Sequence, residues 1–163
     1  MSKDVFKLLA GKDDVESKAV IGYTENEINK IEALYDIKVK GEFRDFMLQM
    51  GRSDGGLIGD DPIVLYRPAW TVRGQILFQI NLFNSLQEYG AWDQINKPFS
   101  FSRESETQYY YLQTEKNDGL VYHFDENAGS VECTNLTFLE YLLDVRKRYP
   151  YKGVVCKGEL IVV

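Results

Sequence analysis

The chain has 163 residues, of which 44% are apolar and 27% are charged. This composition is typical of a folded protein and excludes a disordered chain. Its 25 Asp and Glu outnumber its 19 Lys and Arg, so the net charge is −6, which disfavours direct nucleic-acid binding and favours a basic partner. The length fits one hydrophobic core, and we therefore expect a single domain over residues 1–163.

An N-terminal helix is expected within residues 1–20, because Val5, Phe6, Leu8 and Leu9 are spaced for one helix face. A pair of helices is expected over residues 24–51. Thr24 followed by Glu27 has the spacing of a capping box, and apolar residues then recur every three or four positions. Gly51 is a residue type that commonly ends a helix.

Residues 56–134 are expected to be rich in strands. The run PIVLYRPAW (62–70) resembles a strand interrupted by Pro68, GQILFQINLF (74–83) fits a strand or a helix, and NSLQEYG (84–90) fits a short helix. The segments FSFSRES, TQYYYLQT and LVYHFDE alternate as strands do, with a hairpin turn at KNDG (116–119). Trp70 and Trp92 are expected to be at least partly buried, although either could anchor an interface.

A helix is expected over residues 136–149, with a second capping box between Thr137 and Glu140. The apolar segment 153–163 is expected to be a C-terminal strand that completes its own sheet or, less often, pairs with a partner at a sheet edge. This order of elements predicts an α+β fold with an antiparallel-rich mixed sheet flanked by helices.

The N-terminus lacks the long apolar core of a signal peptide, and no run of residues reaches the length of a membrane span. Two cysteines, Cys133 and Cys156, are too few for a disulfide framework. We therefore expect a cytoplasmic protein that does not bind membranes. The sequence leaves the oligomeric state open, with a slight preference for a monomer.

Catalytic and metal-binding residues are sparse. His123 lies on a strand without an obvious nucleophile, so it is more often a packed or surface residue than a catalytic base. His123, Cys133 and Cys156 have no recognised metal-ligand spacing. The loop GRSDGGLIG follows a helix and lacks the Gly-Lys-Ser/Thr of a phosphate-binding loop. We therefore expect no catalytic residue, no cofactor and no metal.

Acidic residues near the strands are the candidate contacts for a basic partner. Glu104 and Glu106 are two apart on one expected strand and should point the same way, whereas the other acidic residues lie in loops, where such residues are usually just solvated. An outward tyrosine would be a good anchor, and Tyr110 is the candidate. The candidate partner-binding residues are Asp60, Asp61, Glu104, Glu106, Tyr110, Asp125 and Glu126.

Two stretches resemble the SUKH superfamily, the Smi/Knr-like group. The first is TENEINKIEALYDIKVKGEFRDFMLQMGRSDGG (24–56), which is similar to the family's capped helix, second helix and glycine-bearing loop. The second is PFSFSRESETQYYYLQTEKNDGLVYHFDENAGSVECTNLTFLEYLLD (98–144), which resembles its strand pair and following helix.

This resemblance implies a SUKH-like domain and a bacterial immunity protein of the kind used in contact-dependent inhibition. Such a protein would neutralise a cognate secreted toxin, such as a nuclease, by covering its active site or a nearby surface. A regulatory scaffold of the Smi/Knr type is the alternative. A small hydrolase that uses His123 is the second alternative.

Overall fold

The computed structural model describes residues 2–11, 19–149 and 153–162. The helices are α1 (Val5–Ala10), α2 (Glu25–Tyr35), α3 (Gly41–Met50), α4 (Val72–Glu88) and α5 (Phe138–Arg148), with the 3-10 helices η2 (Val64–Tyr66) and η3 (Trp92–Gln94). The strands are β1 (Val20–Ile21), β2 (Ser53–Asp54), β3 (Pro98–Ser105), β4 (Gln108–Gln113), β5 (Leu120–Asp125) and β6 (Ser130–Thr137). The predicted α+β class is confirmed, and every strand pair in the described ranges is antiparallel.

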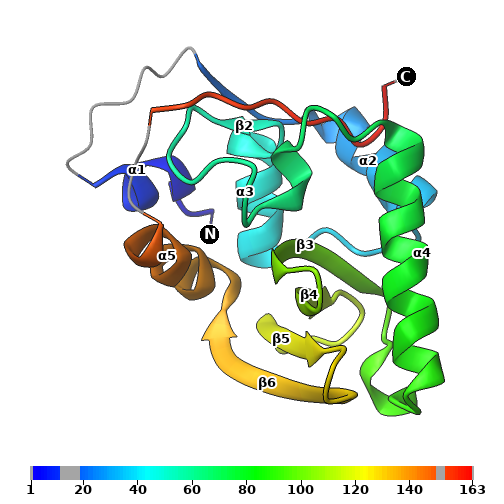
Figure 1. Ribbon diagram of the computed structural model, residues 1–163. Coiled ribbons are helices and arrows are strands. Elements are labelled where there is room, and N and C mark those ends of the chain that lie inside the picture. The colour runs from blue at the N-terminus through cyan, green and yellow to red at the C-terminus, as the bar shows by residue number, and fades with distance from the viewer. Residues whose placement is uncertain (1, 12–18, 150–152, 163) are drawn as a thin grey trace.

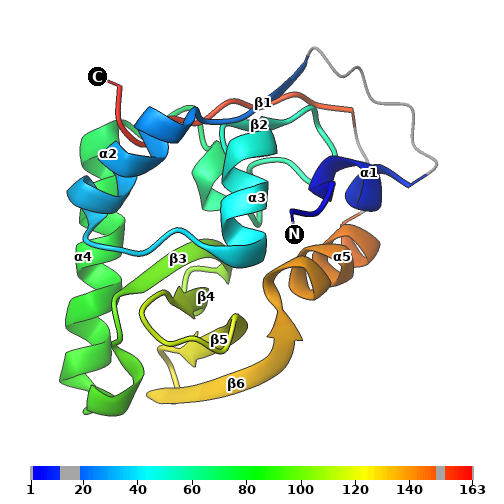
Figure 2. The ribbon, with the colours of Figure 1, turned by 180° about the vertical axis from the view of Figure 1, so that it is seen from behind.

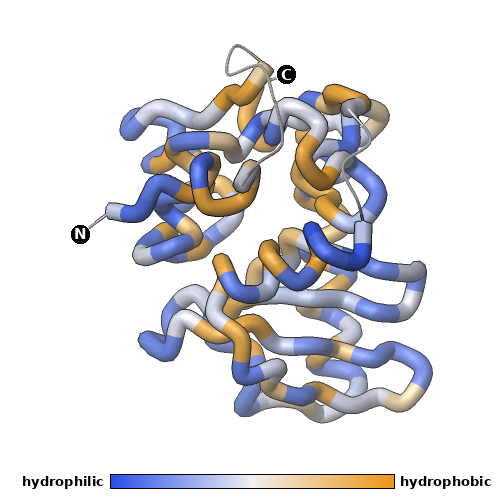
Figure 3. The backbone as a smooth tube through the Cα atoms, turned by 90° about the vertical axis from the view of Figure 1, so that its left-hand side faces the viewer, coloured by the Kyte–Doolittle hydropathy of each residue, from blue (hydrophilic) through white to orange (hydrophobic). Residues whose placement is uncertain are grey.

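The main sheet is a meander in the order β3-β4-β5-β6, and β1 pairs with β2 in a separate two-stranded sheet. Helices α4 and α5 lie on opposite sides of the meander (Figures 1 and 2). Side chains alternate between the two faces of a strand, so the ring of Tyr109 lies 5.7 Å from Phe78 of α4, while that of Tyr110 lies 4.9 Å from Tyr141 of α5. Polar and apolar residues are interspersed along the chain rather than separated into different parts of it (Figure 3). Both faces of the sheet are therefore partly covered by helices.

The helix pair α2 and α3 packs above β3. The capping box is present: Thr24 accepts from the backbone of Glu27, whose side chain accepts from the backbone of Thr24. On α3, the ring of Phe43 lies 5.6 Å from Phe99 of β3 and 5.4 Å from Phe138 of α5. The apolar face read from the sequence thus joins the sheet to the last helix.

The region between α3 and β3 differs from the sequence expectation. In the run 62–70, only Ile63 pairs as a strand would, with Ser102, and Val64–Tyr66 forms η2. The segments 74–83 and 84–90 are not two elements, because most of both lies in the single helix α4, which Thr71 caps by accepting from the amide of Gly74. Only one face of the run 74–83 is buried, with Gln75, Phe78 and Leu82, and an apolar run of this length does not by itself distinguish a strand from a helix.

The expected N-terminal helix is confirmed only as α1, which is shorter than the range 1–20; residues 12–18 lie outside the described ranges. The final helix is confirmed as α5, with the capping box of Thr137 and Glu140 present.

The expected strand over residues 153–163 is wrong for its described part, 153–162, which contains no strand. Scattered hydrogen bonds hold this segment instead of a strand ladder, and the amide of Gly158 donates to the carbonyl of Arg52 at 2.9 Å. The carbonyl of Leu160 accepts from the Tyr35 hydroxyl at 2.7 Å, and its amide donates to the Tyr23 hydroxyl at 3.1 Å. Because these backbone groups are satisfied by side chains, the segment needs no sheet edge of its own.

Candidate partner-binding surface

The candidate residues lie at one end of the main sheet. Gln108 of β4 pairs with Asp125 of β5, and the amide of Glu126 donates to the carbonyl of Thr107 in the β3–β4 turn. The loop that carries Asp60 and Asp61 reaches the same end, because the amide of Arg103 donates to Pro62. We call this set of seven the acidic rim: Asp60, Asp61, Glu104, Glu106, Tyr110, Asp125 and Glu126.

One expectation about the rim is wrong. Glu104 lies on β3, but β3 ends at Ser105, so Glu106 lies in the β3–β4 turn rather than on the same strand. An irregularity in the pairing with β4 falls between Arg103 and Ser105. Glu106 is exposed, whereas the side chain of Glu104 is only 11% exposed. The two carboxylates therefore have different surroundings.

Glu104 of β3 contacts two side chains of α5. Its carboxylate forms two hydrogen bonds with the guanidinium of Arg148, and one of its oxygens accepts from the Tyr141 hydroxyl at 3.0 Å. The Tyr141 hydroxyl also lies 2.8 Å from that of Ser102. Burial, with the charge of Glu104 next, raises the pKa of Tyr141 well above its usual range. Within the rim, Glu104 thus anchors α5 to β3.

Tyr110 lies beside this anchor and is half-buried. Its ring stacks on His123, with ring centroids 4.7 Å apart and planes 11° from parallel. Burial, followed by the charge of Glu104, raises the pKa of Tyr110 to about 12. Its hydroxyl therefore stays protonated at neutral pH, and it already interacts with the carboxylate of Glu104.

His123 is connected to the end of β5 through an amide. Its Nε2 is hydrogen-bonded to Gln108 Oε1, and Gln108 Nε2 donates to Asp125 Oδ1 at 3.0 Å. Asp125 also accepts from the amides of Asn127 and Ala128, and these bonds, with that of Gln108, lower its pKa. An amide cannot relay a proton as a carboxylate can. This series of hydrogen bonds therefore orients the ring of His123 without activating it as a base.

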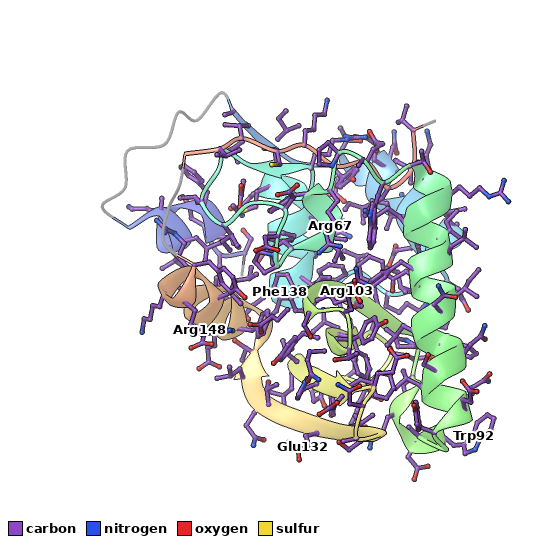
Figure 4. All side chains as sticks on the ribbon, viewed as in Figure 1. Arg67, Trp92, Arg103, Glu132, Phe138 and Arg148 are labelled. Carbon is purple, nitrogen blue, oxygen red and sulfur yellow. The ribbon has the colours of Figure 1, made fainter. Side chains whose placement is uncertain are left out.

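Two arginines that the sequence reasoning missed adjoin the acidic loop. Arg67 donates to the backbone carbonyls of Asp60 and Asp61, at 3.0 and 2.8 Å. The Arg67 guanidinium lies 4.8 Å from the ring centroid of Trp70, and that of Arg103 lies 5.7 Å from it. Burial and the charge of Arg103 lower the pKa of Arg67. Figure 4 shows Arg67 and Arg103 close together in this part of the molecule. No signal in the sequence links residues so far apart.

The glycine loop is organised by its own carboxylate. Asp54 accepts from the amides of Gly56, Ile58 and Gly59 at 2.7–3.0 Å. These are the backbone donors that a bound phosphate would need. Burial raises the pKa of Asp54 in spite of these bonds. The loop therefore has a structural role, in agreement with the sequence.

A cleft of about 430 Å³ lies at the other end of the sheet, between the α2–α3 connection, the β4–β5 hairpin and the start of α5. Phe43, Leu112 and Phe138 contribute apolar lining, and Lys38 and Lys116 contribute positive charge. None of the rim residues lines it.

The expected burial of tryptophan holds for Trp70 but is wrong for Trp92, which is 64% exposed on η3.

In the described part of the chain, no group of His, Cys, Asp and Glu is arranged to hold a metal ion. No helix in the same ranges has the length and apolar character of a membrane span.

A family model described as SUKH_5, SMI1-KNR4 cell-wall, matches residues 2–147. No curated protein and no solved structure matches the chain. The match includes both stretches on which the resemblance was based and also the middle region between them. The chain therefore belongs to the SMI1-KNR4 (SUKH) family.

Proposed function

We propose that this protein is an immunity protein that binds a cognate secreted toxin and neutralises it without catalysis. Proteins of this family are typically immunity proteins to polymorphic toxins and are generally non-catalytic. Family membership is the observation that carries the proposal. The net charge of −6 supports a basic partner, such as a nuclease toxin.

We further propose that the acidic rim contacts the toxin. Glu106 and Asp61 are exposed, and both lie in turns that project from the end of the sheet. Carboxylates in such positions can stand in for the phosphates that a nuclease binds, and they speed the encounter with a basic surface. Half-buried Tyr110 would add an aromatic anchor. The bound protein would then cover the toxin's active site or a surface next to it.

Co-expression with the toxin domain encoded beside this gene tests the proposal. We expect growth to be rescued and the two chains to co-purify. A failure of both would contradict the immunity function.

The contact surface is tested separately with a matched pair of variants. Glu106 and Glu115 are both exposed, and they lie beyond opposite ends of β4. Replacing either by Lys changes the net charge equally, so a general charge effect would act on both. We expect Glu106→Lys to weaken toxin binding about tenfold and Glu115→Lys to have little effect. Equal weakening of toxin binding by the two variants would contradict the acidic rim as the contact surface. The proposed immunity function would not be affected by that result.

A regulatory scaffold is the second candidate, and the words "cell-wall" in the family description favour it. Gene context distinguishes the two, because an immunity gene should lie directly beside a toxin gene.

A hydrolase would depend on His123, so His123→Ala should abolish a hydrolytic activity and leave immunity largely intact. The contacts of His123 with Tyr110 and Gln108 favour the orienting role described above.

A further inference from the structure

Helix α4 presents an apolar stripe that the described part of the chain leaves exposed. Its buried residues, Val72, Gln75, Phe78, Leu82 and Leu86, face the rest of the protein. On the other side, Leu77 is 48% exposed and Ile80 is 47% exposed, and Phe83 beside them is 37% exposed. In both ribbon views α4 lies at the outer edge of the molecule, where only the end of α2 reaches as far out beside it (Figures 1 and 2). Exposed apolar residues that are grouped in this way commonly mark an interaction surface.

The charges at the two ends of α4 complement each other. Arg73, in the first turn, and Glu88, the last residue, are exposed and follow the apolar residues at helical spacing. We call this set the outer stripe: Arg73, Leu77, Ile80, Asn84 and Glu88. Among residues 2–11, 19–149 and 153–162, neither Arg73 nor Glu88 forms an ion pair. The outer stripe is therefore positive at one end, apolar in the middle and negative at the other end.

These charges are also the wrong way round for an isolated helix. The first turn of a helix favours acidic residues and the last turn favours basic ones, yet α4 has no acidic residue in its first turn and no basic residue in its last. A second α4 helix running antiparallel would reverse this relation. Arg73 would lie beside the C-terminal turn of the second helix, and Glu88 beside its N-terminal turn.

We propose that this chain forms a homodimer in which two α4 helices pack antiparallel about a two-fold axis near Ile80. A two-fold interface brings the same patch of both copies together, so the patch must complement itself. The outer stripe meets this requirement: Leu77 and Ile80 pack against the same residues of the second copy, and Arg73 pairs with the partner's Glu88. Helical side chains lean toward their own N-terminus, which brings these two charged groups toward each other in an antiparallel pair.

The area buried between the two α4 helices sets the expected affinity of the dimer. A helix of 17 residues is about 25 Å long, and one pair of such helices buries less than the roughly 800 Å² per partner of a standard interface. We therefore expect a reversible dimer with a Kd on the order of 10 μM.

Sedimentation velocity on the full chain, from about 1 to 200 μM, tests the proposal, because self-association depends on concentration. We expect the average mass to rise from one chain toward two. Ile80→Glu should remain monomeric throughout. Leu8→Glu is the matched control, because Leu8 is 50% exposed and lies on α1, on the opposite side of the molecule (Figures 1 and 2); it should dimerise as the wild type does. Circular dichroism establishes that each variant is folded.

A charge swap tests the orientation of the helices. We expect Arg73→Glu and Glu88→Arg each to raise the Kd about tenfold or more, because each change creates two like-charged pairs in a symmetric dimer. The double variant restores both pairs, so its Kd should return to within about threefold of the wild type.

Three results would overturn the dimer: a wild type that stays monomeric, an Ile80→Glu variant that still dimerises, or a double variant no tighter than the single ones. A monomeric wild type whose Ile80→Glu variant loses toxin binding would assign the outer stripe to the toxin instead. The dimer does not depend on the immunity function, since sedimentation of the chain by itself measures self-association without a toxin.

Discussion

The ion-pair cluster around Arg52 provides the clearest prediction about stability. Arg52 is 9% exposed and donates to Glu27 at 2.6 and 3.1 Å and to Glu159 at 3.1 Å. Its guanidinium also lies 4.1 Å from the ring centroid of Tyr23. One side chain thus links α2, the start of the glycine loop and the C-terminal segment. Replacing it by Met keeps the apolar stem and removes the charge.

The pKa of Glu27 gives the magnitude. The hydrogen bond from Arg52 is the largest cause that lowers this pKa, from 4.5 to about 2. A shift of this size corresponds to about 3 kcal/mol. The side chain of Glu27 is 21% exposed, and solvent screening reduces the contribution to about 2 kcal/mol. We therefore expect Arg52→Met to lower the free energy of unfolding by about 2 kcal/mol at neutral pH.

Urea unfolding at several pH values measures this effect. Because the pKa of Glu27 is lower in the folded state, its contribution is present above about pH 4.5 and is lost as the pH falls toward about 2. The difference between the wild type and Arg52→Met should shrink over the same interval. Arg44→Met is the control, because Arg44 pairs with Glu25, whose side chain is 67% exposed; it should cost less than about 0.5 kcal/mol.

Equal losses for the two arginine variants would refute this reasoning. So would a difference between the wild type and Arg52→Met that does not change with pH, because the charge of Glu27 would then not be its source. An altered dependence on urea concentration would indicate a change in the unfolded state instead.

Two other substitutions have definite expected outcomes in the same unfolding assay. Gly56 and Gly59 both have φ +92°, but a Cβ at Gly56 would lie 2.9 Å from the carbonyl oxygen of Val154, whereas one at Gly59 has nothing within 4 Å. Gly56→Ala should therefore lower the free energy of unfolding by about 1 kcal/mol more than Gly59→Ala does. Equal losses of stability would show that the backbone around Gly56 shifts to make room for the methyl group. Thr137→Ala removes the cap of α5 and should cost about 1 kcal/mol, while Thr137→Ser should cost much less. An alanine variant as stable as the serine variant would contradict the capping role.

Features set by a few neighbouring residues were predictable from the sequence. The capping boxes at Thr24 and Thr137 are present because the side chain and the backbone it caps are three residues apart. The turn KNDG joins β4 to β5 as expected, with Gly119 at φ +63°.

Features set by distant contacts were not predictable. The cap-like Asn84 predicts a break in α4, whereas burial of one continuous face against the sheet keeps the helix intact. The apolar composition of the C-terminal segment predicts a strand, yet Leu160 finds its backbone partners in the side chains of Tyr35 and Tyr23, more than 100 residues away in the sequence. Local propensity is a weak guide where tertiary contacts of this kind decide.

The same distinction applies to the acidic rim. The sequence identified its carboxylates by charge, but charge alone does not reveal which of them are engaged within the fold. Glu104 is neutralised by Arg148, which approaches from a helix 44 residues later, and Asp125 is occupied by the amides of its own turn. Exposed Glu106 has no such partner among the contacts of the described residues, whereas the charge of Asp61 lies close to Arg67, which donates to the Asp61 carbonyl at 2.8 Å. A basic partner would therefore meet the negative charge of the turns, while the charge on the strand serves to hold α5 in place.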